Sequence, residues 1–162
     1  MERRGSGGIA GILILAAFLL LQWDGLAGKP APDFKLDQAY GGRVDLSTYR
    51  GRPVLLAFWL TSCGICRHEL PLLDRLGPEF SARGVEVLAV NIRDLPGARE
   101  YMASERLHLT NLIDADGETA ERYGVSGVPK LVLIGADGKI RKSAAGYQNE
   151  KTLREWMTSV AR

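Results

Sequence analysis

The chain has 162 residues, two of them cysteines, with 46% hydrophobic residues, 25% charged residues and a formal net charge of +2. This balance is that of an ordinary globular protein, and the length fits one domain. The small net charge, without a dense basic face interleaved with aromatic residues, argues against a nucleic-acid partner. Two cysteines are also too few for a disulfide scaffold, so the fold must depend on its core.

Residues 1–28 form a separate segment by composition. Arg3 and Arg4 precede an uncharged span from Gly5 to Trp23, which is about the length that one helix needs to cross a bilayer. Because arginines stay in the cytoplasm and tryptophan favours the far interface, we expect a single-pass membrane anchor with the rest of the chain outside the cytoplasm. The small residues 25–27 also suit a signal peptidase, so a cleaved signal peptide and release to the periplasm is the alternative.

Residues 29–162 form the predicted folded domain, which is long enough to bury a core. Residues 29–36 are extended and broken by prolines, so we expect a linker that becomes an edge strand. The pair at 41–42, Gly-Gly, indicates a hairpin to a short strand at 43–46. Ser47 can then cap a short turn.

Beyond this hairpin, apolar runs of strand length alternate with apolar residues at helical spacing. Runs that are apolar throughout are typical of strands buried on both faces of a sheet. The predicted strands are residues 53–59, 85–92, 111–114, 130–134 and 139–143, and the predicted helices are residues 63–80, 98–107, 118–123 and 149–160. This order predicts an α/β domain with a mixed central sheet flanked by helices.

Both cysteines, Cys63 and Cys66, lie where a buried strand passes into a helix. The first turn of a helix presents unpaired N–H groups and a partial positive charge, which stabilise a thiolate. We expect Cys63, at the helix tip, to be the exposed nucleophile that attacks a disulfide. Cys66, one turn further, is expected to be shielded and to resolve the mixed disulfide.

A C-x-x-C pair is also half of a zinc site, which needs about four ligands. The other candidate ligands are His68 and His108, and His68 should point away from the pair. A copper- or zinc-binding module is therefore an alternative of a different class. We expect instead a redox-active disulfide that needs no cofactor and no metal.

A second motif, Y-G-V-S-G-V-P-K at 123–130, lies just before the predicted strand at 130–134. With the C-x-x-C pair, it resembles the thioredoxin superfamily, whose members carry a cis-proline here, facing the cysteines. The resemblance implies a cis bond before Pro129 and a Val128 backbone that pairs with the bound partner strand. It also implies that Pro129 keeps metals from the thiols. Lys130, unusual at its place, is expected to favour an acidic partner.

Three further stretches, 31–34 (A-P-D-F), 44–59 and 87–94, resemble the TlpA/ResA group of membrane-anchored, extracytoplasmic thioredoxin-like proteins. The resemblance implies a thioredoxin fold with an N-terminal hairpin extension. It implies a reductant of disulfides in extracytoplasmic partner proteins, as in cytochrome c maturation or copper-centre assembly. A membrane thiol-reductant conductor of the DsbD/CcdA type would re-reduce it. A disulfide-donating oxidase or isomerase and a peroxiredoxin-like peroxidase are the alternatives.

Resolution by Cys66 needs a proton acceptor, and the sequence offers one candidate. Thioredoxin has a buried aspartate six residues before its first cysteine, where this chain has Ala57. The ResA-like proteins place an acid at the end of the next strand, and Asp94 matches that place. Asp94 can take the Cys66 proton if it is partly buried, and is otherwise a solvated loop carboxylate or a helix cap.

The sequence also predicts where four more side chains near the cysteines lie. The family position of Trp59 is beside the disulfide, where it covers one side of the site and helps to bind the partner; a core tryptophan is the alternative. Arg67, His68 and Glu69 follow Cys66 on the predicted helix. We expect all three to lie on its solvated face.

Overall fold

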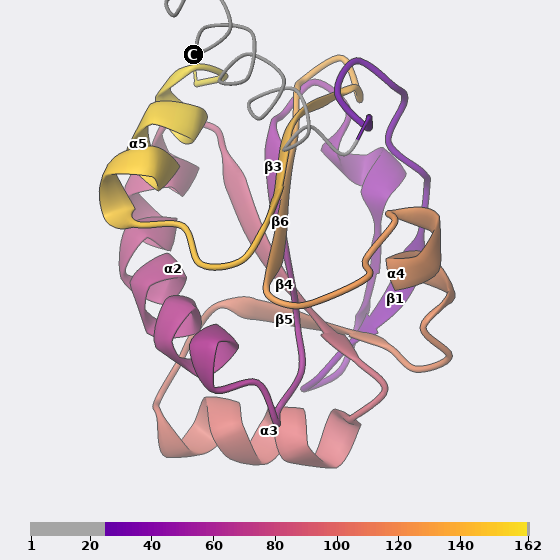
Figure 1. Cartoon of the computed structure of the whole chain (residues 1–162), viewed down its shortest axis with the longest axis vertical. Helices are drawn as coiled ribbons and strands as arrows, with labels where there is room; N and C mark the ends of the chain where they lie inside the picture. Colours follow the sequence, from indigo (N-terminus) through magenta and orange to yellow (C-terminus); the bar gives the residue numbers. More distant parts are fainter. Residues whose placement is uncertain (1–24, 162) are drawn as a thin grey trace, which may run out of the picture.

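A mixed sheet of seven strands runs through the computed structural model, which describes residues 25–161 (Figure 1). The expected membrane anchor at 5–23 lies outside the described residues. Among the helices of residues 25–161, none has both the length and the apolar character needed to span a bilayer.

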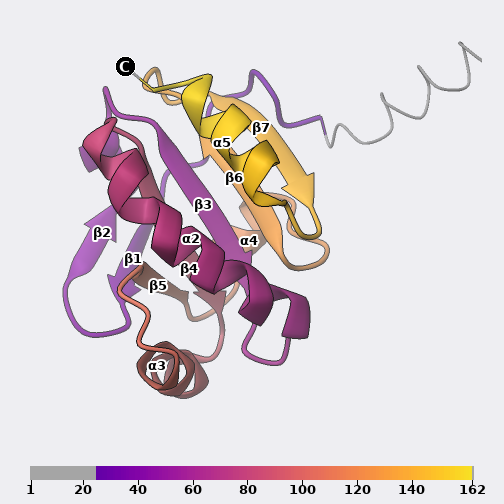
Figure 2. The ribbon, with the colours of Figure 1, turned by 90° about the vertical axis from the view of Figure 1, so that its left-hand side faces the viewer.

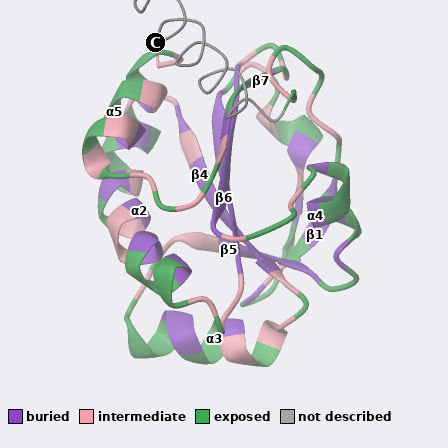
Figure 3. Ribbon diagram, in the orientation of Figure 1, coloured by how far each residue is buried: buried purple, intermediate pink, exposed green. Residues whose placement is uncertain are grey.

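The sheet has the order β2-β1-β5-β4-β3-β6-β7. Its strands are β1 (Lys35–Gln38), β2 (Arg43–Asp45), β3 (Val54–Trp59), β4 (Glu86–Ile92), β5 (Thr110–Asp114), β6 (Lys130–Ile134) and β7 (Ile140–Ala145). The pairs β3–β4 and β4–β5 are parallel, and the other four neighbouring pairs are antiparallel. The central strands are buried along most of their length (Figure 3), which explains their unbroken apolar sequences.

Helices cover both faces of the sheet (Figures 1 and 2). They are η1 (Leu46–Tyr49, a 3-10 turn), α2 (Gly64–Ala82), α3 (Leu95–Ser104), α4 (Glu118–Arg122) and α5 (Glu150–Thr158). The apolar residues of α2, α3 and α5 pack on one face, and those of η1 and α4 pack on the other. This arrangement is a thioredoxin-like α/β fold, with β1 and β2 as the expected hairpin extension.

The structure corrects three details of the predicted elements. Strand β1 is not at an edge, because it pairs with β5 as well as with β2, which is the edge strand. Helix α3 begins at Leu95, three residues earlier than expected, because the Asp94 side chain accepts a hydrogen bond from the Gly97 N–H and caps it. The turn η1 is capped by Asp45, whose side chain accepts from the Ser47 N–H.

The cysteines and the first described residues lie at opposite ends of the sheet. Cys63 follows the carboxyl end of β3, beside the start of β6, which is antiparallel to β3. The entering chain instead lies on the β6–β7 turn, where Gly28 N–H donates to Ile140 O at 2.8 Å and Ala31 N–H donates to Gly138 O at 2.9 Å. The site therefore faces away from the end at which the chain enters the domain (Figure 1).

Candidate active site

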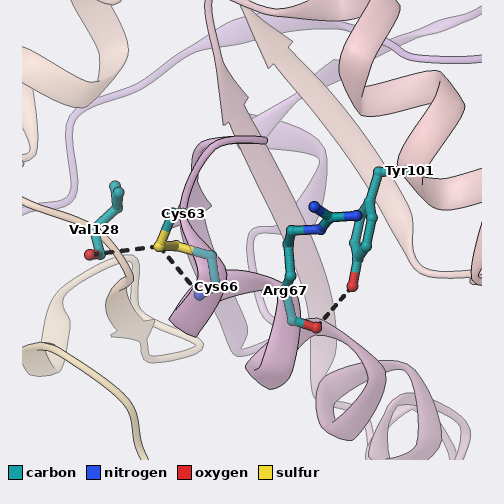
Figure 4. The surroundings of a disulfide bond; sticks show 5 residues. All are labelled: Cys63, Cys66, Arg67, Tyr101 and Val128. Atoms are coloured by element: carbon teal, nitrogen blue, oxygen red, sulfur yellow. Dashed lines mark hydrogen bonds between the residues drawn. A yellow bond between two sulfur atoms is a disulfide. The ribbon is translucent and has the colours of Figure 1, made fainter.

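Cys63 and Cys66 form a disulfide at the start of α2, with their Cα atoms 5.2 Å apart (Figure 4). Cys63 is the N-cap residue of the helix, and its Sγ accepts a hydrogen bond from the Cys66 N–H at 3.1 Å. After reduction, a thiolate on Cys63 would accept the same N–H and face the positive end of the α2 dipole. The backbone thus prepares Cys63 to act as a nucleophile.

The two sulfurs differ in their exposure to solvent. Cys63 is half-buried, whereas Cys66 is 1% exposed and packs with Trp59 and Leu70 beneath the helix. A partner can reach the first sulfur and not the second. This difference in access agrees with attack by Cys63 and resolution by Cys66.

The residue before Pro129 faces the disulfide from another element. The Val128–Pro129 peptide bond is cis, as the resemblance implies. The carbonyl oxygen of Val128 lies 3.8 Å from Cys63 Sγ (Figure 4). Because an oxidised sulfur carries no proton, this is a contact in the present state, and a reduced Cys63 thiol could donate to the same oxygen. Gly146 N–H donates to Pro129 O at 2.8 Å and holds this segment to the end of β7.

Trp59 lies underneath the site, where it is 1% exposed. Its Nε1–H donates to Asn111 Oδ1 at 3.0 Å, and its ring contacts Tyr101 with 5.6 Å between the centroids. The side chain thus packs with Cys66 in one apolar cluster. In this conformation Trp59 supports the disulfide from the core and offers almost no surface to a partner.

Asp94 is half-buried and serves as the N-cap of α3. Its carboxylate accepts hydrogen bonds from the hydroxyl of Thr61, two residues before Cys63, and from the Gly97 N–H. These bonds, the one from Thr61 first, lower the pKa of Asp94 below its usual value. A lowered pKa makes a carboxylate a weaker base, so the geometry gives Asp94 a clear capping role and only an indirect link to the cysteines.

Glu69 does not lie on the solvated face of α2, where the sequence predicted it. It is 2% exposed, not solvated, and its Oε1 accepts a hydrogen bond from the Gln148 N–H at 2.8 Å. Burial raises the pKa of Glu69 to about 7. It lies three residues after Cys66 and four before Leu73, both buried on α2, and this helical spacing was the signal that could have placed it inward.

The expectation that Lys130 favours an acidic partner is wrong, because the side chain is buried. It is 4% exposed, and its Nζ donates to Gly124 O at 3.2 Å beneath the segment that leads to Pro129.

Arg67 and His68 are exposed, as expected. His68 contacts the ring of Tyr147 with 5.4 Å between the centroids, and Arg67 lies over the ring of Tyr101.

The site contains the groups that thiol–disulfide exchange requires. Within residues 25–161, no three His, Cys, Asp or Glu side chains are grouped so that they could hold a metal ion. The cysteine pair can itself store two electrons as a dithiol and release them as a disulfide. A half-buried sulfur at a helix start, a buried second sulfur and a facing cis-proline on a thioredoxin-like sheet define a thiol–disulfide oxidoreductase.

Comparison with known proteins agrees with this class. The model of the AhpC/TSA family matches residues 27–143. The thiol-disulfide oxidoreductase ResA of Geobacillus thermodenitrificans is 34% identical over 152 residues, covering 93% of this chain and 87% of the relative. ResA of Bacillus subtilis is 32% identical over 134 residues, covering 82% of this chain and 75% of the relative.

A solved structure gives the same result. The putative thiol:disulfide interchange protein DsbE from Chlorobium tepidum is 31% identical with a TM-score of 0.77, and the match covers 83% of this chain and 96% of that one. The chain therefore belongs to the AhpC/TSA family, as a ResA-like thiol–disulfide oxidoreductase of the thioredoxin superfamily.

Proposed function

We propose that this oxidoreductase is a reductant of disulfides in partner proteins outside the cytoplasm. The observation that carries the direction of electron flow is the burial of Cys66. Strong oxidants of this class owe their high potential to a stabilised reduced form. Here Cys66 is 1% exposed and packs with Trp59 and Leu70, and burial in apolar surroundings disfavours its thiolate. The reduced form is therefore less stabilised than in a strong oxidant, which favours donation of electrons.

In the proposed reaction, the Cys63 thiolate attacks one sulfur of the partner disulfide. A mixed disulfide forms, and the other partner sulfur leaves as a thiolate. The Cys66 thiolate then attacks the Cys63 sulfur, so the partner departs with two added electrons and the Cys63–Cys66 disulfide forms. Val128 and Pro129 hold the partner strand, and Trp59 supports the site from below. Asp94, which is linked to the cysteine segment through Thr61, is the candidate acceptor of the Cys66 proton.

The cellular setting is part of the proposal. The uncharged span at 5–23 supports an anchor in the inner membrane, or export to the periplasm if it is cleaved. A related solved structure, 25% identical with a TM-score of 0.69, is of a secreted disulfide oxidoreductase from Mycobacterium tuberculosis. A membrane conductor of the DsbD/CcdA type would return the electrons, and the substrates would be proteins of cytochrome c maturation or copper-centre assembly.

The midpoint potential of the Cys63–Cys66 couple tests this function. The full chain, in non-ionic detergent, would be equilibrated with redox buffers and its free thiols counted. A value close to that of thioredoxin, about −270 mV, supports a reductant. A value towards about −120 mV would make the protein a disulfide donor and overturn the proposed direction. Absence of a reversible two-electron couple would overturn the mechanism itself.

A further inference from the structure

The disulfide has two flanks, and Val128 occupies one of them. Arg67 and Tyr101 lie on the other (Figure 4). On this second flank a cavity of about 240 Å³ opens between the start of α2 and α3. Its lining residues are Thr61, Arg67, Gly97, Glu100, Tyr101 and Ser104. Two of these residues, Thr61 and Arg67, border the Cys63–Cys66 segment in the chain, so the cavity adjoins the side of the site opposite Val128.

The side chain of Arg67 is held in place on this flank. Its guanidinium carbon lies 4.7 Å from the centroid of the Tyr101 ring. The hydroxyl of Tyr101 donates to the Arg67 carbonyl oxygen at 2.7 Å, and the ring is 6% exposed and packed against Trp59. Because the ring already fixes the guanidinium, less side-chain freedom remains to be lost when Arg67 binds a ligand.

The Arg67 guanidinium contacts the Tyr101 ring but forms no ion pair within residues 25–161. No carboxylate of these residues lies within 4.0 Å of its guanidinium, although Arg75 and Arg154 both form such ion pairs. Arg67 is also exposed. A guanidinium offers paired N–H donors that match a carboxylate. An arginine next to a reactive disulfide that is ordered, exposed and unpaired with any carboxylate of the described part of the chain is suited to an anion on the partner.

We propose that Arg67 is a specificity-determining residue that selects partners with an acidic side chain next to their disulfide. This inference rests on the proposed reduction of partner disulfides and adds the chemistry of the preferred partner. Glu100 is exposed and lines the same cavity from α3, so it disfavours an acid on the α3 side and leaves the Arg67 side as the place for it. Lys130 cannot have this role, because it is buried and donates to Gly124 O.

The test uses the full chain, reduced and held in non-ionic detergent. Its substrates are three peptides with one internal disulfide, identical except for the residues flanking each cysteine, which are Glu, Gln or Lys. We expect the second-order rate constant for the Glu peptide to exceed that for the Gln peptide about twofold to fivefold, the range that an exposed ion pair supplies. The Lys peptide should be slowest, and added salt should reduce the preference.

Variants then assign the preference to Arg67. Arg67→Gln should bring the ratio of the Glu to the Gln rate constant to about one, and Glu100→Gln should raise it. Arg75→Gln, on the exposed side of the same helix, is the matched control and should keep the ratio of the parent protein. The midpoint potential of Arg67→Gln should equal that of the parent, because a recognition role does not act on the sulfurs.

Three results would overturn the inference: equal rate constants for the Glu and Gln peptides in the parent protein, a preference that survives in Arg67→Gln, or a shift of its midpoint potential that accounts for the rate change. Failure of the proposed function looks different. In that case the reduced protein would leave all three peptides oxidised, whatever their charge.

Discussion

The carbonyl oxygen of Val128 lies 3.8 Å from Cys63 Sγ, across the gap between the cis-proline segment and the start of α2. The two residues are 65 positions apart in sequence and meet because β3 and β6 are paired antiparallel neighbours. A partner strand that paired with the Val128 backbone would have its sulfur beside Cys63. The same contact therefore relates partner binding to nucleophilic attack.

Replacement of Cys66 by alanine should trap the mixed disulfide. Cys63 can still attack a partner, but the buried sulfur that releases it is missing. We expect thiol-sensitive adducts of the full chain with a disulfide-containing peptide, seen as a mass increase on non-reducing electrophoresis. Cys63→Ala is the control and should give few adducts, because the remaining sulfur is 1% exposed in the folded protein. Equal trapping by both variants would contradict the assigned roles.

Glu69→Gln should change how stability depends on pH. The folded protein raises the pKa of Glu69 from 4.5 to about 7, so the native state binds this proton more tightly than the unfolded state does. The stability of the parent should thus fall relative to that of Glu69→Gln as pH rises from about 4.5 to about 7, and then stay constant.

The size of this effect is roughly 3 kcal/mol, since one pKa unit corresponds to about 1.4 kcal/mol. The measurement is urea unfolding of the oxidised proteins at pH 4.5 and pH 8. Glutamine keeps an oxygen that can accept from the Gln148 N–H, so the variant preserves the contact and removes the charge. Parallel pH curves for the two proteins would show that Glu69 does not titrate as described.

Two variants of Asp94 separate its capping role from the proposed proton transfer. Asp94→Asn keeps an N-cap that is as good as aspartate, whereas Asp94→Ala removes it. Because the pKa of Asp94 is lowered in the fold, its contribution to stability is lost as pH falls through that pKa. We expect Asp94→Ala to lower the thermal midpoint at pH 7 and Asp94→Asn to leave it nearly unchanged.

The rate of disulfide reduction by Asp94→Asn tests the proton transfer. If the carboxylate takes the Cys66 proton, this stable variant should resolve the mixed disulfide more slowly at neutral pH. The rise of its rate with pH should lie at higher pH than in the parent, because Cys66 must then lose its proton to solvent. A pH–rate profile identical to that of the parent would leave Asp94 with the cap alone.

Trp59→Phe should destabilise the oxidised protein by about 1–3 kcal/mol, because Asn111 Oδ1 loses the donor at 3.0 Å and stays buried. The free energy of unfolding in urea measures this loss. Trp156→Phe is the matched control, since Trp156 is only partly buried, at the edge of another cluster. A smaller loss at position 59 than at position 156 would contradict the importance of the Trp59–Asn111 bond.

Sequence alone was sufficient for much of the fold and for the reactive pair. Continuous apolar runs of strand length predicted β3, β4 and β6, because strands covered on both faces have no solvated positions. The spacing of Cys63 and Cys66 after a strand predicted a dithiol at a helix start. These features are local, so a short window of sequence contains the physical information that determines them.

Only the tertiary structure decided which side chains share an environment. The edge position of 29–36 was mispredicted, because the pairing of β1 with β5 joins segments about 75 residues apart. Asp94 and Glu69 are both acids near the site, yet one is an N-cap with a lowered pKa and the other is buried with a raised one. Lys130 is covered by the segment before Pro129. The burial and pKa of a side chain depend on which distant segments pack against it. The residues next to it in sequence do not determine these contacts.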